Sequence, residues 1–319
     1  MAAVIETFLD IEPIDFTDTG LSKDSLKGEV AVVTGSTSNV GLGFARAIAA
    51  AGGNVVISGN NEKAGTEIVR VIDAENSPGT SMFVKCDVTE EKDVKNLAEK
   101  SFEKFGKVDI LINNAMNLAL NGPVLKSPVS DLDRAYAISG RGVMLTIKEF
   151  VPAMLERKHG AVMYSTTQFH YSPPMIGGAI YTAGKAAATS ITMSLANEIG
   201  SYEESGVGVF CMIPGGVERQ PRPTVSPDGR EMSDITNAPR FMAPGFGGPI
   251  PPEACGIALV YCILNAGKLH RSGISVNDAF EAMSYPYPKP ETLRKNEMRR
   301  LTDNELTLVF RNMGPGFSG

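Results

Sequence analysis

The stretch Val30–Gly43 constrains the fold of this chain more than any other part of the sequence. It begins with four apolar residues, continues through a turn rich in glycine and serine, and leads into the alanine-rich segment that starts at Phe44. The first part is typical of a buried strand, and the last part is typical of a helix. We therefore expect a strand, a glycine turn and a helix in direct succession.

A turn of this kind suits a bound pyrophosphate, because the N–H groups at the start of a helix are unpaired and carry the positive end of its dipole. Gly35 permits the tight turn, while Gly41 and Gly43 would let the backbone approach a ligand and let the helix pack on the sheet. The alternative is an ordinary tight turn that binds no ligand.

Composition and charge restrict the class of protein. With 319 residues, of which 43% are apolar and 21% charged, the chain is typical of one large globular α/β domain with appendages. A formal net charge of −6 and the lack of a long apolar run argue against nucleic-acid and membrane partners. The N-terminus resembles no secretion signal, and the cysteines lack the spacing of metal ligands or a disulfide framework. We expect a cytoplasmic protein with reduced thiols and no metal.

Strand-like runs alternate with helix-like segments along most of the chain. Strands separated by helices form parallel βαβ units, so we expect a doubly wound parallel sheet. After the first strand, the expected strands are 54–59, 82–87, 107–115, 160–167, 207–214 and 273–278, and the expected helices are 62–74, a segment capped by Thr89, 131–155, 181–199 and 253–267.

The chain divides into a Rossmann-type domain and two extensions. We expect an N-terminal extension at 1–27, the catalytic domain at 28–280 and a C-terminal tail at 281–319, with a helix at 291–301. Residues 217–253 are rich in proline and lack periodicity. A long irregular insert is typical of a substrate lid, and a flexible surface loop is the alternative.

Tyr181 and Lys185 form the pattern with the clearest chemistry. Their spacing on a helix puts them on one face, a turn apart. A phenol ordinarily has a pKa of about 10, and a neighbouring cation favours the phenolate. Tyr181 is therefore a candidate acid and base for interconverting an alcohol and a carbonyl group. In isolation, the same spacing also fits a half-buried tyrosine beside a surface lysine.

Several motifs together resemble the short-chain dehydrogenase/reductase family, in the family's order and separations over residues 28–280. They are Thr34-Gly35 with Gly41-x-Gly43, Cys86-Asp87-Val88, Asn113-Asn114-Ala115, Tyr181-x-x-x-Lys185 and Pro214-Gly215. The resemblance implies a Rossmann-type enzyme that moves a hydride between a nicotinamide cofactor and a carbon bearing oxygen.

The resemblance also implies catalytic roles. Tyr181 would donate or accept the proton, and Lys185 would bind the nicotinamide ribose and lower the pKa of Tyr181. Thr167 falls at the position of the family's serine that hydrogen-bonds the substrate oxygen, with Thr166 and Ser165 as neighbours able to replace it.

The cofactor residues implied by the resemblance come from several segments. Asp87 and Val88 would contact the adenine, Asn113 and Ala115 the adenosine side, and Pro214 the nicotinamide. The full expected set is Gly35, Ser36, Ser38, Asn39, Val40, Gly41, Asn60, Asp87, Val88, Asn113, Ala115, Lys185, Pro214 and Gly215.

Of the positions that depart from the family pattern, three bear on the reaction. Asn39 replaces the middle glycine of the turn, where asparagine tolerates left-handed geometry. Met116 replaces the glycine after Asn-Asn-Ala. Ser139 falls where the family often has an asparagine that holds a water on the proton relay to lysine, and a serine can still hold that water. The alternative is therefore a lyase, dehydratase or epimerase with a bound nicotinamide and no net redox. A non-catalytic binding protein is disfavoured because the tyrosine and lysine are retained.

The end of the second strand bears on the choice of cofactor. NAD-specific relatives usually have an acid there, and NADP users often have an arginine. This chain has Gly59, Asn60 and Asn61 instead, so no carboxylate repels a 2′-phosphate. Ser58 and both asparagines can donate hydrogen bonds to it, and Lys63 is the nearby cation. The sequence favours NADP(H) over NAD(H).

The helix of Tyr181 also bears on partners. Small residues such as Ala183 and Ala186–Ala188 line one side of it. Relatives commonly pair this helix between subunits, so the resemblance implies a homodimer or homotetramer. The expected substrate is a small or medium-sized molecule.

Overall fold

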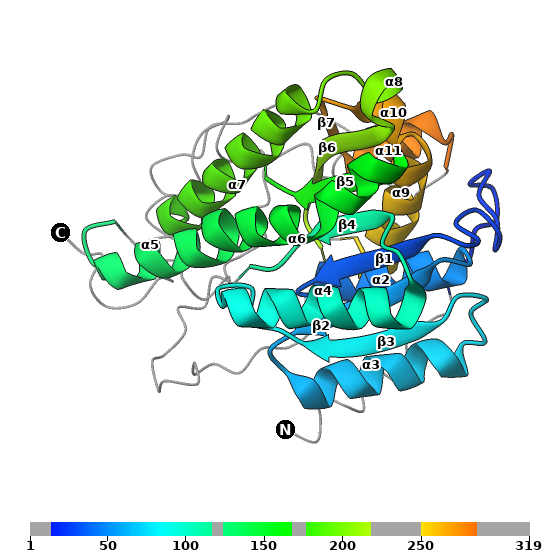
Figure 1. Ribbon diagram of the computed structural model, residues 1–319, viewed down its shortest axis with the longest axis horizontal. Helices are drawn as coiled ribbons and strands as arrows, with labels where there is room; N and C mark the ends of the chain where they lie inside the picture. The colour runs from blue at the N-terminus through cyan, green and yellow to red at the C-terminus, as the bar shows by residue number, and fades with distance from the viewer. Residues whose placement is uncertain (1–13, 117–123, 168–176, 218–249, 286–319) are drawn as a thin grey trace, which may run out of the picture.

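The fold is described from a computed structural model, in which residues 14–116, 124–167, 177–217 and 250–285 are described (Figure 1). Half of the expected N-terminal extension, most of the expected lid and the expected helix at 291–301 fall outside these residues. Among the described helices, none combines the length and the apolar character that a membrane crossing requires.

One parallel sheet of seven strands forms the centre of the molecule, which confirms the doubly wound architecture (Figure 1). The strand order is β3-β2-β1-β4-β5-β6-β7, so the chain changes direction across the sheet between β1 and β4. In folds of this kind, ligands bind where the strand order reverses, in a crevice at the carboxyl ends of the strands. The strands are β1 Val30–Thr34, β2 Asn54–Gly59, β3 Ser81–Lys85, β4 Ile110–Asn113, β5 Gly160–Ser165, β6 Val207–Ile213 and β7 Gly273–Ser275.

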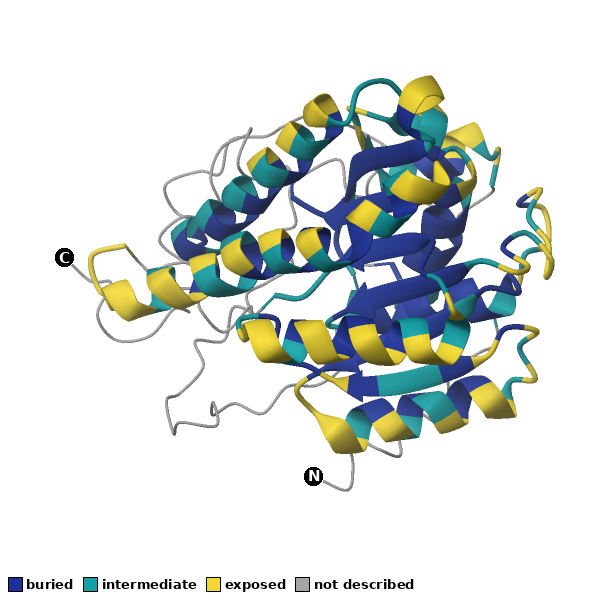
Figure 2. Cartoon of the chain, viewed as in Figure 1, coloured by how far each residue is buried: buried dark blue, intermediate teal, exposed yellow. Residues whose placement is uncertain are grey.

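Helices cover both faces of the sheet, so that the central strands are buried and the helices are exposed on their outer sides (Figure 2). Phe44 of α2 and Leu259 of α9 belong to the core on one face. Leu97 of α4, Phe150 of α6 and Ala188 of α7 belong to the core on the other. The helices are α2 Asn39–Ala50, α3 Glu62–Ala74, α4 Glu91–Phe105, α5 Val129–Tyr136, η2 Ala137–Arg141, α6 Gly142–Arg157, α7 Ala179–Glu198, α8 Tyr202–Ser205, α9 Pro252–Leu264, α10 Ala266–Leu269 and α11 Val276–Ala282.

The helix after the glycine turn packs closely on α9. A Cβ atom on Gly43 would lie 1.9 Å from the carbonyl oxygen of Pro252, so this glycine serves the contact with α9 rather than the expected contact with the sheet. Arg46, buried on the same helix, forms ion pairs with Glu75 and Glu253. These pairs tie α2 to the end of α3 and to the start of α9.

Two local expectations are wrong. Thr89 does not cap α4, because its hydroxyl donates to Asp87 Oδ1 at 2.8 Å and Glu90 occupies the N-cap position without a side-chain hydrogen bond. The last strand does not reach residue 278. It ends at Ser275, which forms a capping box with Asp278 and so begins α11.

Candidate active site

The glycine turn after β1 has the tight geometry that a close ligand requires. Gly35 has φ +63°, and a Cβ atom there would lie 2.7 Å from Ala115 Cα. A Cβ atom on Gly41 would lie 2.4 Å from the carbonyl oxygen of Gly35. Asn39 has φ 47°, as expected for an asparagine that replaces glycine in a left-handed position. The turn therefore keeps its shape despite this substitution.

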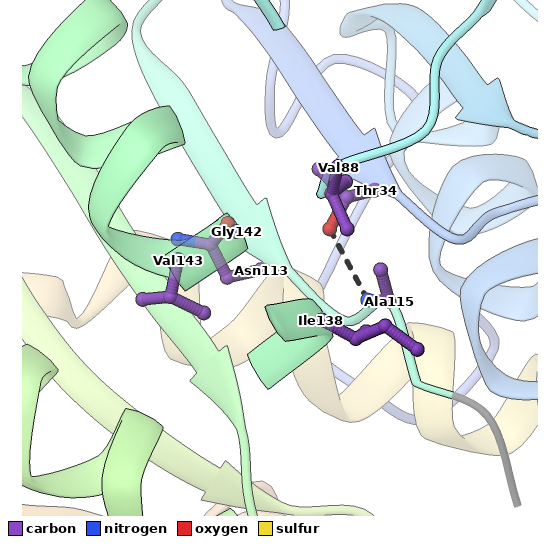
Figure 3. A pocket seen from close by; sticks show the side chains of 7 residues that line it. All are labelled: Thr34, Val88, Asn113, Ala115, Ile138, Gly142 and Val143. Atoms are coloured by element: carbon purple, nitrogen blue, oxygen red, sulfur yellow. Dashed lines mark hydrogen bonds between the residues drawn. The ribbon is translucent and has the colours of Figure 1, made fainter. Parts of the chain in front are cut away.

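Two residues that were not among the expected site residues lock this turn to the end of β4. The amide Nδ2 of Asn114 donates to the carbonyl oxygens of Thr34 and Gly35, both at 3.1 Å. In return, the Thr34 hydroxyl accepts a hydrogen bond from the backbone N–H group of Asn114 at 3.0 Å. It also accepts one from the N–H group of Ala115 at 3.2 Å, which Figure 3 shows. Thr34 and Asn114 belong to the Thr34-Gly35 and Asn113-Asn114-Ala115 motifs, so the sequence did contain a sign that they matter for the turn.

The start of α2 has the features of an anion-binding site. Ser38 occupies the N-cap position, where its side chain makes no capping hydrogen bond, and the first turn contains no acid. The N–H groups and the positive end of the helix dipole therefore remain suited to a phosphate. Ser36, by contrast, is fully buried, donates to the Val33 carbonyl oxygen at 2.6 Å and accepts from the Ser58 N–H at 2.9 Å. Its hydroxyl joins the end of β1 to β2 and so shapes the turn.

A small pocket lies at the carboxyl ends of β1 and β4, beside the turn. The expected cofactor residues Val88, Asn113 and Ala115 lie together in its wall (Figure 3). Asn113 Oδ1 accepts from Thr146 Oγ1 at 2.7 Å, whereas its buried Nδ2 has no partner in the described part of the chain. The full lining is Thr34, Val88, Asn113, Ala115, Ile138, Gly142 and Val143.

Asn60 and Asp87 meet at the carboxyl ends of β2 and β3. Asn60 Nδ2 lies 3.5 Å from Asp87 Oδ2, and the other oxygen of Asp87 accepts from the N–H of Thr89 at 3.0 Å. The Ser58 side chain is fully buried, so it is not among the surface donors for a 2′-phosphate, which corrects one part of the expectation. Asn61 is exposed and its Oδ1 caps α3.

Helix α7 brings Tyr181 and Lys185 to the end of β5. The Nζ atom of Lys185 lies 5.9 Å from the centroid of the Tyr181 ring and 4.9 Å from that of the Tyr164 ring. Lys185 also donates to the carbonyl oxygen of Ser165. Its side chain is buried, and this burial lowers the pKa of Lys185 to about 7. The ammonium is therefore poised to lose its proton near neutral pH.

The threonines after β5 have different surroundings. Thr166 Oγ1 lies 2.6 Å from Thr189 Oγ1 of α7, so its hydroxyl is committed to the helix. Thr167 follows it and is also buried. Because the Thr166 hydroxyl is hydrogen-bonded to Thr189, Thr167 is favoured as the residue whose hydroxyl contacts the substrate.

Ser139 lies in η2, a short π-helical segment inside the helix that was expected at 131–155. Such segments frequently occur at functional sites. Ser139 Oγ donates to Met116 Sδ at 3.2 Å. Met116 and Ser139, two of the departures from the family pattern, are therefore in direct contact.

Pro214 and Gly215 follow β6 at the same edge of the sheet. The carbonyl oxygen of Pro214 accepts from Cys255 Sγ at 3.3 Å, and Gly215 has φ 75°. Because the sheet is parallel, the ends of β1 to β6 lie along one edge and carry the expected site segments other than those on η2 and α7.

The family follows from comparison with known proteins. A family model described as short chain dehydrogenase matches residues 29–228. This chain belongs to that family. Secoisolariciresinol dehydrogenase of Forsythia intermedia is 30% identical over 219 residues, which cover 68% of this chain and 73% of that protein. Tropinone reductase-like 1 of Erythroxylum coca is 30% identical over 195 residues, covering 60% and 68%.

Two solved structures share the fold of this short chain dehydrogenase. A 3-ketoacyl-(acyl-carrier-protein) reductase from Brucella melitensis, complexed with NADH, has a TM-score of 0.66 at 23% identity and covers 78% of this chain and 97% of its own. A 7α-hydroxysteroid dehydrogenase, complexed with NADH and 7-oxo glycochenodeoxycholic acid, has a TM-score of 0.66 at 24% identity, covering 80% and 96%.

This short chain dehydrogenase is accordingly an NAD(P)-dependent oxidoreductase, and its crevice fits such a cofactor. The glycine turn has no room for Cβ atoms at Gly35 or Gly41. The start of α2 lacks a competing acid, and the buried Asn113 Nδ2 has no partner among the described residues. Close backbone approach, an anion site and an unused donor are what a dinucleotide requires.

A cluster that sequence reasoning missed lies at the opposite edge of the sheet in this short chain dehydrogenase. Glu29, Asp109 and His159 bring possible metal-ligating atoms within 4.8 Å of one another. The buried Asp109 carboxylate, however, pairs with Lys107 at 2.8 Å and with Arg157 at 3.1 Å. Its charge is already compensated, so the arrangement is that of an ion-pair cluster.

Proposed function

We propose that this enzyme interconverts an alcohol and a carbonyl group on a small or medium-sized molecule, with Tyr181 as the general acid and base. The proposal rests on the arrangement of Tyr181 and the buried Lys185 on α7, beside the end of β5 and on the same edge as the glycine turn. Bound NAD(P)(H) supplies or accepts the hydride.

Each residue has a separate task in this reaction. During reduction, the Tyr181 hydroxyl donates its proton to the substrate oxygen, while the Thr167 hydroxyl holds that oxygen in place. The charge of Lys185 stabilises the phenolate that remains on Tyr181. Because burial lowers the pKa of Lys185 to about 7, the lysine can pass a proton onward without leaving its site. Oxidation runs through the same steps in reverse.

We propose NADP(H) as the preferred cofactor. Asn60, Asn61 and Lys63 are exposed after β2, and the carboxylate of Glu62, which lies between them in the sequence, pairs with Lys85 at 3.6 Å. The amides donate hydrogen bonds, and the ammonium supplies one positive charge. The buried Ser58 takes no part.

A lyase, dehydratase or epimerase without net redox is the second candidate. It is supported by the contact between Met116 and Ser139. The Ser139 hydroxyl, which would hold the relay water, donates its hydrogen bond to the Met116 thioether. Product formation without a change in the nicotinamide absorbance would distinguish this candidate from the first.

We also propose a homodimer or homotetramer that pairs through α7. Ala183, Ala186 and Ala187 are only partly buried on its outer side. Tyr136 of α5 and Met144 of α6 are exposed on neighbouring helices, at 43% and 51%. Light scattering of the purified protein tests this state.

All four cysteines are buried and free, in keeping with the proposed cytoplasmic location.

The proposed reaction is tested in two stages. First, thermal unfolding is followed with NAD, NADH, NADP and NADPH at equal concentration, because the ligand that binds the folded protein most tightly raises the melting temperature most. Next, the best stabiliser is used with a panel of ketones and aldehydes, and nicotinamide absorbance is recorded. The proposal predicts stabilisation, most by NADPH, and cofactor oxidation with at least one carbonyl compound. Stabilisation together with redox-silent product formation would contradict it.

A further inference from the structure

A second phenol, which is fully buried, lies next to the catalytic pair. Tyr164 is in β5, has 0% of its surface exposed and faces the core beneath α7. Its Oη atom has no hydrogen-bond partner among the described residues. A buried hydroxyl without a partner is destabilising, and buried polar groups in native proteins are usually hydrogen-bonded to protein or to an ordered water. An ordered water is therefore expected beside this hydroxyl.

Tyr164 contacts the catalytic lysine more closely than Tyr181 does. The Nζ atom of Lys185 lies 4.9 Å from the Tyr164 ring centroid, within the range of a cation–π interaction. The next residue, Ser165, accepts a hydrogen bond from the same Nζ atom through its carbonyl oxygen. Two consecutive residues of β5 thus hold the ammonium, one by its ring and one by its backbone.

The phenol group of Tyr164 also lies beside Ser139. Burial raises the pKa of Tyr164 well above its ordinary value, and hydrogen bonding toward the Ser139 side chain lowers it. The two hydroxyls are therefore near each other, although no direct hydrogen bond to Tyr164 Oη forms among the described residues. The Ser139 hydroxyl already donates to Met116 Sδ, so it has an oxygen lone pair left for a further donor. Ser139, Tyr164 and Lys185 therefore form one buried polar group that spans η2, β5 and α7.

We propose that Tyr164 is a positioning residue for Lys185, and that its phenol and the Ser139 hydroxyl share a buried water that hydrogen-bonds toward the ammonium. Serine is shorter than the asparagine that the family often has at this position. The Tyr164 phenol provides a second hydrogen-bonding group that holds the water in place. This inference rests on the proposed function, since the position of Lys185 matters for catalysis only if Tyr181 transfers the proton.

The first test measures the titration of Lys185 in the cofactor-free protein. NMR of isotope-labelled lysine side chains follows the ammonium, with the Lys185→Met variant identifying its signal. The titratable groups that face Lys185 are Tyr164 of β5, Tyr181 of its own helix and Cys211 of β6. Tyr164→Phe keeps the ring and removes only the hydroxyl with its water. The Lys185 midpoint should then fall by roughly one pH unit, because the charged form loses a hydrogen bond.

Matched variants separate positioning from packing. Thr192→Val removes another buried hydroxyl of α7, which bonds only to the Ala188 carbonyl oxygen among its described partners. It should reduce the melting temperature slightly and leave the Lys185 midpoint unchanged. Ser139→Ala should lower the midpoint as Tyr164→Phe does, and the double variant should show no further change, because both residues hold the same water. Ser139→Ala also serves if Tyr164→Phe fails to fold.

The second test uses whichever carbonyl compound the enzyme turns over. Tyr164→Phe should lower kcat by roughly tenfold and leave KM unchanged. An unchanged Lys185 midpoint in Tyr164→Phe, or fully additive effects of the two single variants, would overturn the inference. The absence of turnover with every carbonyl compound would instead contradict the proposed function, and the lysine titration would still decide the role of Tyr164.

Discussion

The side-chain oxygens of Thr166 and Thr189 lie 2.6 Å apart, which ties the residue after β5 to the helix that carries Tyr181. Thr189 donates its own proton to the Lys185 carbonyl oxygen at 2.9 Å, so Thr166 is the donor in the pair. The strand end and the catalytic helix are thus joined by a buried hydrogen-bonded chain. Thr167, the next residue, is the candidate for substrate contact.

The two threonines should therefore respond differently to replacement by valine. Thr166→Val removes a buried hydrogen bond, and we expect a loss of about 1 kcal/mol in the free energy of unfolding with little loss of turnover. Thr167→Val should lower kcat/KM by roughly 100-fold. Urea unfolding and steady-state kinetics measure both effects. The reverse pattern would assign the substrate hydroxyl to Thr166.

Asn114 should control cofactor affinity without touching the cofactor. Asn114→Ala removes both hydrogen bonds to the carbonyl oxygens of Thr34 and Gly35, so the glycine turn loosens. We expect a loss of roughly 2 kcal/mol in stability and about a tenfold weaker binding of the preferred cofactor. Calorimetric titration measures the affinity, and Asn96→Ala on the exposed side of α4 is the control. Equal affinities in both variants would refute this role.

The buried Lys185 should make the stability depend on pH. Its pKa in the folded protein is about 7, below the ordinary value of 10.5, so the unfolded chain binds more protons between these pH values. The burial penalty is therefore fully present below pH 7 and disappears as the pH rises toward 10.5. Lys185→Met should be more stable than the parent below neutral pH, by up to roughly 4 kcal/mol. This difference should shrink in alkaline solution, and a constant difference in urea unfolding across the range would speak against the penalty.

Asn60 offers a test of cofactor choice. Asn60→Asp places a carboxylate beside the expected 2′-phosphate and next to Asp87, whose Oδ2 lies 3.5 Å from Asn60 Nδ2. We expect NADPH binding to weaken by about tenfold relative to NADH, because like charges repel. Asn60→Ala is the uncharged control and should alter the ratio little. An unchanged ratio of the two dissociation constants in the aspartate variant would place the 2′-phosphate elsewhere.

Local patterns in the sequence were sufficient for most of the sheet. β2 at Asn54–Gly59 and α3 at Glu62–Ala74 have the expected bounds, because an apolar run ends there in a glycine and an asparagine that caps the next helix. The expected cap at Thr89 is wrong because its hydroxyl can donate to Asp87 as well as accept from the helix. Spacing does not decide between these two uses.

The part of the site that depends on contacts between distant residues could not be read from the sequence. The carbonyl partner of Lys185 and the ring beneath it come from β5, on an element separate from α7. Tyr164 lies within a strand-like apolar run, where its phenol has no distinguishing pattern. The π-helical η2 segment around Ser139 likewise depends on packing and has no sequence signature.

The central claim is that the phenol oxygen of Tyr181 transfers the proton. Tyr181→Phe keeps the ring and removes only that oxygen, so the measurement is kcat of this variant together with the rise in melting temperature caused by the preferred cofactor. We predict that kcat falls by roughly 100- to 10,000-fold while the cofactor raises the melting temperature as much as in the parent protein. Turnover within about tenfold of the parent would contradict the account.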